Sequence, residues 1–269
     1  MDIFVGQATT MRTTVLILLL FVGTMTGLQA ADAWGATGHR ATGEIAQRLL
    51  SKKAQKAIAK ILDGQSLAFV STYGDEIKSD ERYRSYSPWH YVNFPFGSTY
   101  AESEKSDQGD LVHGINMCLE VLKSTAATKQ ERQFHLKMLV HFIGDLHQPL
   151  HVGIAEDRGG NRRQVRWFDD GTNLHRVWDT TMIEFYGMSY TELADNVALL
   201  SKSQLESLQQ GSITDWVMES RALCMDVYEN TEIGEKLGYE YMYKYFNTVR
   251  DQLQKGGVRL AYILNEIYG

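Results

Sequence analysis

Histidine and aspartate side chains with metal-ligand spacing lie close together in the segment His141–His151, which reads H-F-I-G-D-L-H-Q-P-L-H. His141 and Asp145 are four residues apart. On a helix this spacing places both side chains on one face, about 5–6 Å apart at Cβ. Pro149 cannot continue a helix interior, so the helix should end just before it and His151 should follow from a non-helical position. Imidazole and carboxylate groups together form a ligand set that suits zinc.

A second pair with the same spacing follows, His175 and Asp179 in L-H-R-V-W-D. One such pair alone is more simply explained as an ion pair on a helix surface. Two pairs together with His151 are more ligands than one ion needs, because structural zinc is usually four-coordinate. The spacing therefore favours a zinc site with more than one ion over two surface ion pairs.

The elements that must position these side chains are predicted to be helices. The chain has 269 residues, 43% hydrophobic and 22% charged, with only three prolines and no repeat or linker. We expect an all-α, multi-helix single domain with at most a short β-hairpin. Periodicity and capping residues predict helices over 39–50, 52–62 (Ser51 as N-cap), 67–77, 111–122, from the Thr128–Glu131 capping box to Gln148, and 174–185. The remaining expectations are a polar loop at 79–108 with an extended segment at 89–96, a hairpin strand at 164–168 with its turn at 169–171, and a helical scaffold at 190–268.

Residues 1–33 have the features of a signal peptide. They contain a positive charge, an apolar stretch too short for a confident membrane span, and a small-residue cleavage site: Arg12, Val15–Val22 and Ala31-Asp32-Ala33. Cleavage would export a domain of residues 34–269, beginning at Trp34, to the periplasm or the cell exterior. A retained membrane anchor is the alternative, and translation could also start at Met11.

An oxidising compartment would allow the only two cysteines, Cys118 and Cys224, to form a disulfide, but the sequence leaves open whether they lie close together. The formal net charge is −6, and it becomes −5 without Asp2, Arg12 and Asp32. No basic face is evident, which argues against a protein that coats duplex nucleic acid. Nucleic acid as a substrate stays open, because several zinc ions would change the local charge.

All eight histidines lie between residues 39 and 175. Three of them, His113, His135 and His147, lack a motif-like setting and are interpreted as surface or core histidines. The other five stand in an ordered series of motifs: W-G-x-x-G-H, G-D-E-I-K, W-H-Y-V-N, H-F-I-G-D-x-x-Q-P-L-H, G-G-N and L-H-x-x-W-D. In this order, behind a signal peptide, they resemble the single-strand-specific zinc nuclease family of fungi, plants and bacteria. Zinc-dependent phospholipase C is a more distant branch on the same fold.

The resemblance implies three zinc ions and phosphodiester hydrolysis. The implied ligand sets are Asp75, His90, His141 and Asp145 for one ion; His151, His175 and Asp179 for a second; and His39, Asp145 as a bridge and the α-amine and carbonyl of Trp34 for the third. Cleavage between Ala33 and Trp34 would free that amine. Zinc makes hydroxide available near neutral pH and can stabilise the departing 3′ oxygen, so the products would be 5′-nucleotides. Activity on 3′-nucleotides is left open.

The same resemblance suggests residues that contact the substrate. Asp75 would orient the attacking water, and Lys78 stands where relatives carry an arginine that contacts phosphate. Tyr91 matches an aromatic residue on which a base stacks, Asn93 replaces an aspartate that bonds the base edge, and Asn161 could reach the scissile phosphate. The plain structural alternatives are a solvated lysine, a tyrosine packed in the core and a turn-forming asparagine.

The expected substrates are single-stranded DNA and RNA, because a base in a duplex would first have to be unstacked at a cost of a few kcal/mol. We expect a monomer without a protein partner and without stable membrane association. Phospholipase C activity is the first alternative, and Phe94, Phe96 and Tyr100 near the long loop would serve it as apolar surface. A non-catalytic zinc-binding protein is the second alternative.

Overall fold

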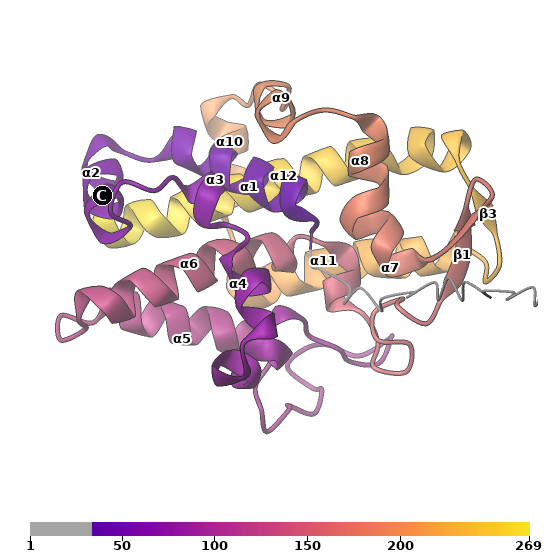
Figure 1. Ribbon diagram of the computed structural model, residues 1–269, viewed down its shortest axis with the longest axis horizontal. Helices are drawn as coiled ribbons and strands as arrows, with labels where there is room; N and C mark the ends of the chain where they lie inside the picture. Colours follow the sequence, from indigo (N-terminus) through magenta and orange to yellow (C-terminus); the bar gives the residue numbers. More distant parts are fainter. Residues whose placement is uncertain (1–33) are drawn as a thin grey trace, which may run out of the picture. The chain divides into compact units, whose positions relative to one another are not determined.

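Helices make up most of residues 34–269, the part of the chain that the computed structural model describes (Figure 1). The α-helices are α1 (Ala36–Leu49), α2 (Lys52–Ile61), α3 (Leu67–Val70), α4 (Tyr73–Glu76), α5 (Leu111–Lys123), α6 (Lys129–Leu146), α7 (Leu174–Arg176), α8 (Met182–Tyr186), α9 (Tyr190–Asp195), α10 (Lys202–Gln209), α11 (Ile213–Glu229) and α12 (Tyr239–Tyr268). Shorter segments are the 3₁₀ helices η1 (Ile77–Ser79), η2 (Glu81–His90) and η3 (Pro149–Val152) and the π-helix η4 (Val177–Thr181). The mostly helical single domain is confirmed. The predicted signal peptide, 1–33, lies outside the described residues.

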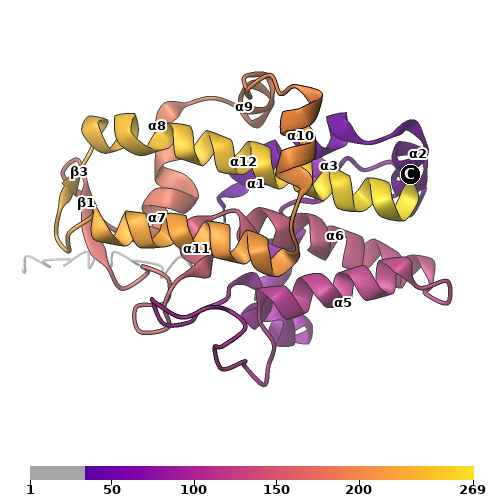
Figure 2. The ribbon, with the colours of Figure 1, turned by 180° about the vertical axis from the view of Figure 1, so that it is seen from behind.

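Helices from distant parts of the sequence are packed side by side. Helix α12, with 30 residues, runs along α1, and α6 contacts α1, α12 and α5 (Figures 1 and 2). Helix α11 packs against η3, the short segment that carries His151. This arrangement brings the N-terminal helix, the middle of the chain and the C-terminal helices to one region, and it confirms the helical scaffold predicted for 190–268.

The second half of α6 is buried on all sides. Every residue from Met138 to Leu146 is buried, and one apolar cluster of the core surrounds Leu139, Phe142 and Ile143. A second cluster packs Trp34 and Trp178 against α12. His141 and Asp145 therefore lie in the interior, so the alternative of a surface ion pair is wrong for them.

Capping residues start two helices where the sequence predicts. The Ser51 hydroxyl accepts a hydrogen bond from the backbone N–H of Ala54 (3.1 Å). Thr128 and Glu131 form the reciprocal capping box that begins α6. Such caps are worth about 1 kcal/mol each. Helix α6 ends at Leu146, two residues before the predicted end.

The predicted helix over 67–77 is wrong, because the chain breaks it into α3, α4 and η1 at Ser71 and Thr72. The Ser71 hydroxyl donates to the Ala68 carbonyl (2.8 Å), and the Ser71 carbonyl accepts from Nδ1 of His141 (2.7 Å). A side chain that bonds its own backbone competes with the helix, and here the freed carbonyl serves a distant histidine.

Two segments that were predicted to be extended or irregular form 3₁₀ turns. His90 ends η2, so the first two residues of the extended segment predicted over 89–96 are helical, and residues 91–95 carry no regular secondary structure. His151 lies in η3 rather than in a non-helical position. Pro149 stands at the start of η3, where its missing N–H costs nothing and its fixed φ suits a helical turn.

A small three-stranded sheet extends the predicted hairpin. Strands β1 (Gln164–Trp167) and β2 (Asp170–Asn173) are antiparallel, and β3 (Lys236–Leu237) pairs parallel with β1. A two-residue strand has no periodicity to recognise, so β3 was not predicted. The helix predicted over 174–185 follows as α7, η4 and α8, and its π-helical part carries Asp179.

Cys118 and Cys224 are both free and buried, and they belong to different apolar clusters. The structure thus decides against the disulfide that the sequence left open. Within residues 34–269, no helix combines the length and the apolar character needed to cross a membrane.

Candidate metal centre

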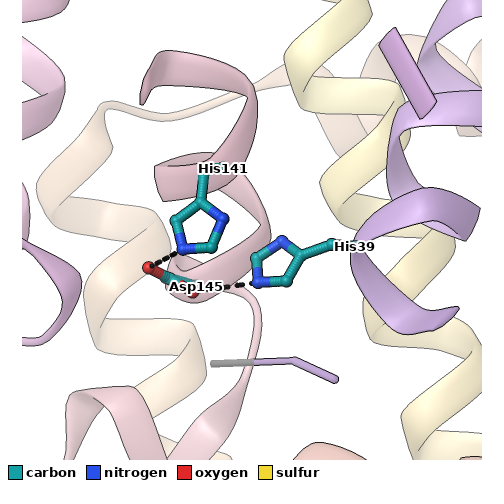
Figure 3. A group of neighbouring side chains, drawn as sticks. All are labelled: His39, His141 and Asp145. Atoms are coloured by element: carbon teal, nitrogen blue, oxygen red, sulfur yellow. Dashed lines mark ion pairs between the residues drawn. The ribbon is translucent and has the colours of Figure 1, made fainter. Parts of the chain in front are cut away.

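Asp145 lies at the centre of a cluster of histidines. Its Oδ2 is 3.0 Å from Nδ1 of His90 and 3.3 Å from Nε2 of His141. Its Oδ1 is 3.3 Å from Nε2 of His39 and 3.7 Å from Nδ1 of His151. Helices α1 and α6 bring His39 and His141 to this carboxylate (Figure 3). The two oxygens face different histidines, which is the arrangement that a bridging ligand requires.

Three groups of side chains offer ligand atoms that lie within 4.8 Å of one another. The groups are His39, His141 and Asp145; Asp75, His90 and His141; and His151, His175 and Asp179. All members are buried except Asp75, which is partly exposed. Every ligand implied by the family resemblance, apart from Trp34, is therefore brought into one of these groups. Because two groups share His141, they adjoin each other.

Backbone carbonyls hold three of the histidines by their Nδ1 atoms. The pairs are His141 with Ser71 (2.7 Å), His151 with His90 (2.6 Å) and His175 with Gly159 (2.6 Å). A carbonyl only accepts, so in each neutral ring Nδ1 carries the proton and Nε2 keeps its lone pair. Histidines that bind metals typically donate their other ring N–H to a carbonyl in this way.

Several of the possible ligand atoms in the cluster lack hydrogen bonds. Among the described residues, buried atoms without a partner include both ring nitrogens of His39, Oδ1 of Asp145, Nε2 of His151 and Oδ2 of Asp179. An unpaired buried polar group costs about 1–3 kcal/mol, so five of them in one cluster indicate a site that a ligand would stabilise. Imidazole nitrogen and carboxylate oxygen are ligands that zinc prefers. The residues present thus fit zinc.

Burial and neighbouring charges shift the pKa values at the cluster in opposite directions. Burial lowers the pKa of His90 to about 3 and also lowers the pKa of His39. At His141 the effect of burial is outweighed by Asp145 and Asp75, which raise its pKa to about 10. Burial by itself would raise the pKa values of Asp75 and Asp145, but they are lowered, because the combined attraction to His141 and to the other neighbouring cationic groups outweighs burial. Ionised carboxylates at neutral pH make the cluster suitable for cations.

Asp75 and Lys78 form an ion pair at the edge of the cluster. Nζ of Lys78 is 2.5 Å from Oδ1 of Asp75, and that oxygen is 3.5 Å from Nε2 of His141. The Lys78 side chain is 24% exposed and is held by this ion pair. Lys78 therefore lies beside Asp75, which belongs to one of the three groups.

A groove of about 710 Å³ is lined by Tyr91 and Asn93, which follow His90. Tyr91 is 45% exposed, so plain core packing is excluded for it, and Oδ1 of Asn93 is buried with no hydrogen-bond partner among residues 34–269. The backbone N–H of Val92 donates to the His151 carbonyl (2.8 Å), which joins this groove to the cluster. Five carboxylates also line the groove: Glu102, Glu104, Asp107, Asp110 and Glu156.

Two further predicted residues lie near the cluster in different ways. Trp34 is fully buried, and the N–H of the next residue, Gly35, donates to the backbone carbonyl of Asp179 (2.7 Å). The side-chain amide of Asn161 donates to the Arg158 carbonyl (2.8 Å), as the turn-forming alternative predicted. The segment after Trp34 thus contacts a member of the third group, whereas Asn161 contacts its own loop.

The three histidines interpreted as surface or core residues stay outside the groups. His147 is buried, and Arg259 donates to its Nε2 (3.1 Å). Burial and the Arg259 charge lower the pKa of His147 to about 3. Nδ1 of His135 forms a hydrogen bond with the Glu131 carbonyl of its own helix, and His113 packs against the ring of Trp89.

Arg221 of α11 lies outside every motif of the sequence, yet it is a structural part of the site. It is 2% exposed and donates to the carbonyls of Val152 (2.9 Å), Gly153 (2.7 Å) and Phe94. These contacts tie the groove segment to the turn that carries His151. A single arginine in an otherwise ordinary helix gives no local signal, so only the tertiary contacts identify it.

Gly144 on α6 offers a direct test of how closely His39 is held. A Cβ atom at Gly144 would lie 2.6 Å from Nδ1 of His39. Alanine improves helix propensity by about 1 kcal/mol, yet in Gly144→Ala the imidazole must move. We expect the folded helix content to be kept and zinc affinity to fall about 10–100-fold, measured by competition with a chromogenic chelator.

The matched control is Gly171→Ala in strand β2, where an added Cβ would meet no atom within 4 Å. We expect this variant to bind zinc as tightly as the unmodified protein. Equal zinc affinity of Gly144→Ala and Gly171→Ala would contradict the placement of His39 as a ligand.

Comparison with known proteins agrees with this geometry. The model of a family described as S1/P1 Nuclease matches residues 34–269. Endonuclease 2 of Arabidopsis thaliana is 30% identical over 95% of this chain and 97% of its own length. Endonuclease 4 of the same plant is 32% identical over 90% and 91%, and Nuclease P1 of Penicillium citrinum is 27% identical over 88% and 98%.

Proposed function

The chain belongs to the S1/P1 nuclease family, and from this premise we propose that it is an exported, zinc-dependent phosphodiesterase that cleaves single-stranded DNA and RNA to 5′-nucleotides. One observation carries the proposal. Three buried His/Asp groups meet around Asp145, and the groove of Tyr91 and Asn93 is joined to them through the backbone.

Three zinc ions would be held by the ligand sets that the family resemblance implies. They are Asp75, His90, His141 and Asp145; His151, His175 and Asp179; and His39, Asp145 and Trp34. When bound, zinc would supply hydroxide near neutral pH and stabilise the charge that develops on the phosphodiester oxygens. Three divalent ions against three carboxylates leave a positive site, which would attract phosphate despite the negative net charge of the chain.

The side chains of the cluster edge would orient the reacting groups. Asp75 would orient the attacking water, since its carboxylate is ionised and partly exposed. Lys78, paired with Asp75, would bring its charge to a non-bridging phosphate oxygen. An ammonium is a point charge rather than a bidentate fork, so Lys78 would bind phosphate with less geometric constraint than an arginine.

The groove would bind the base of the substrate. The exposed ring of Tyr91 offers a stacking surface that accepts any base. The amide of Asn93 can both donate to and accept from a base edge. When substrate binds, the side-chain amide of Asn161 would leave the Arg158 carbonyl and donate its hydrogen bond to the scissile phosphate. Only an unstacked base could enter such a slot, so duplex DNA should be cleaved more slowly; equal rates on duplex and single strands would contradict this.

Export would complete the site. Residues 1–33 would act as the signal peptide, and cleavage after Ala33 would free the α-amine of Trp34. The burial of Trp34 and the bond from Gly35 to Asp179 support this N-terminus as a part of the cluster. N-terminal sequencing of the active, exported protein should therefore begin at Trp34, and another terminus would remove Trp34 from the ligand set.

The proposed function is tested by incubating the mature, zinc-loaded protein with single-stranded DNA, RNA and phosphatidylcholine. Each reaction is run with and without a chelator, and the products are identified by mass spectrometry. We expect release of 5′-nucleotides that the chelator abolishes. Normal zinc content without any turnover would instead indicate a non-catalytic zinc-binding protein.

Phospholipase C activity is the second candidate because of one feature of the groove. Its carboxylates and the exposed Tyr91 ring could bind the quaternary ammonium of choline. Cleavage of phosphatidylcholine without release of nucleotides would indicate that the metal site hydrolyses phospholipids. It would also contradict the base-binding roles of Tyr91 and Asn93.

Replacing Tyr91 by alanine should raise the KM for single-stranded DNA roughly 5–100-fold. Base–aromatic stacking is worth about 1–3 kcal/mol per base, and about 1.4 kcal/mol corresponds to a factor of ten. The turnover number and zinc content should change little, because Tyr91 belongs to none of the three groups. Tyr91→Phe is the control and should keep the KM. A wild-type KM in Tyr91→Ala would exclude Tyr91 from the binding slot.

A further inference from the structure

Gln148 is a fully buried residue that immediately precedes η3, and both atoms of its side-chain amide are engaged. Its Oε1 accepts a hydrogen bond from the backbone N–H of Leu150 (2.5 Å), and its Nε2 donates to Oδ1 of Asp179. A backbone N–H only donates, so the contact with Leu150 determines which end of the amide faces Asp179. Gln148 therefore presents a donor to this carboxylate.

This contact distinguishes the two oxygens of Asp179. Oδ1 is taken by Gln148, whereas Oδ2 lies 3.0 Å from Nε2 of His175 and has no hydrogen-bond partner among residues 34–269. Nε2 of His151 is likewise buried and unpaired, 3.7 Å from Oδ1. With one oxygen of Asp179 held, the other remains available to a cation between these groups.

We propose that Gln148 is a positioning residue for the metal site of His151, His175 and Asp179, and that its amide controls the occupancy of this site. The inference rests on the proposed zinc-dependent function. Carboxylates that bind metals are themselves usually hydrogen-bonded, and loss of such an outer contact typically lowers metal affinity about 10–100-fold.

The C-terminal helix, α12, holds His147, the residue that precedes Gln148. Nε2 of Gln252 donates to the backbone carbonyl of His147 (3.0 Å), and Nη1 of Arg259 donates to the His147 ring (3.1 Å). Arg259 is held in turn by two bonds from its Nη2 to Glu219 (both 2.8 Å). Helix α12 thus secures the residue before Gln148, although it contributes no metal ligand itself.

The test uses Gln148→Glu and Gln148→Leu, with Gln254→Leu as matched control. Gln254 is also buried, and its amide is engaged at both ends by the backbone of Ala198, away from the cluster. Each protein is loaded with zinc, a competing chelator is added stepwise, and zinc per chain is measured by mass spectrometry. We expect three ions on the wild type and the control. Both Gln148 variants should release one of three ions at chelator concentrations about 10–100-fold lower.

Gln148→Glu keeps the shape of the side chain and its acceptor for Leu150 but sets a carboxylate against Asp179. Circular dichroism shows whether each variant folds. If Gln148→Leu does not fold, the zinc release of Gln148→Glu tests the positioning role of Gln148. Release of zinc from Gln148→Glu as from the wild type would overturn the inference while leaving the nuclease function intact. A wild-type protein that binds no zinc would overturn the proposed function and the inference together.

Discussion

Asp145→Asn should lower turnover on single-stranded DNA by about 10³-fold or more. The two oxygens of Asp145 approach His39, His90 and His141 together. An amide has only one acceptor oxygen and would turn an N–H donor toward one of these partners. Metal ions contribute several kcal/mol to transition-state stabilisation, and about 1.4 kcal/mol is a factor of ten in rate. Steady-state kinetics together with zinc analysis should show the loss of turnover and of at least one ion.

The control for this variant is Asp215→Asn. Asp215 caps helix α11 through Ser212 and does not belong to the three metal groups. It should keep wild-type turnover and zinc content. If Asp145→Asn retained three ions and normal turnover, the bridging role of Asp145 would be wrong, and the proposed ligand sets that include Asp145 would be contradicted.

Removing zinc should destabilise the fold and lower the melting temperature by more than about 10 °C. The cluster buries ionised carboxylates and unpaired ring nitrogens that only a cation would satisfy. A ligand present at 100 times its Kd stabilises by about 2.7 kcal/mol, so three independent sites would contribute about 8 kcal/mol. In proteins of 150–250 residues, 1 kcal/mol corresponds to about 2–4 °C. Thermal unfolding with and without a chelator measures the shift.

Adding zinc back should restore the melting temperature, whereas magnesium should not, because imidazole ligands suit zinc better than magnesium. Gly144→Ala offers an internal comparison, since its cluster is expected to be disturbed at His39 alone. A melting temperature that the chelator leaves unchanged would show that the cluster is stable without a cation and would contradict the assignment of a metal centre.

Features that depend on residues close together in the sequence could be predicted from the sequence. The spacing of His141 and Asp145 predicts one helix face, and the structure places both on α6. The caps at Ser51 and Thr128 act within four residues, so their sequence pattern is sufficient. The ordered motifs indicate the family, and the family model confirms it. The mostly helical fold, the candidate ligands and the family were therefore accessible from sequence alone.

Long-range packing determined everything that depends on contacts between distant segments. Burial of the whole second half of α6 removed the surface-ion-pair alternative, and the carbonyl freed at the break at Ser71 bonds to His141, 70 residues away. Other hydrogen bonds likewise join segments that no sequence periodicity relates. They link His175 to the Gly159 carbonyl, Arg221 to the Gly153 carbonyl, and Gln148 to Asp179. The sequence by itself thus determined which residue types could bind metal. Only the tertiary structure decided which nitrogen and oxygen atoms face the cluster, because hydrogen bonds across the core, rather than local spacing, set the orientation of each ring and carboxylate.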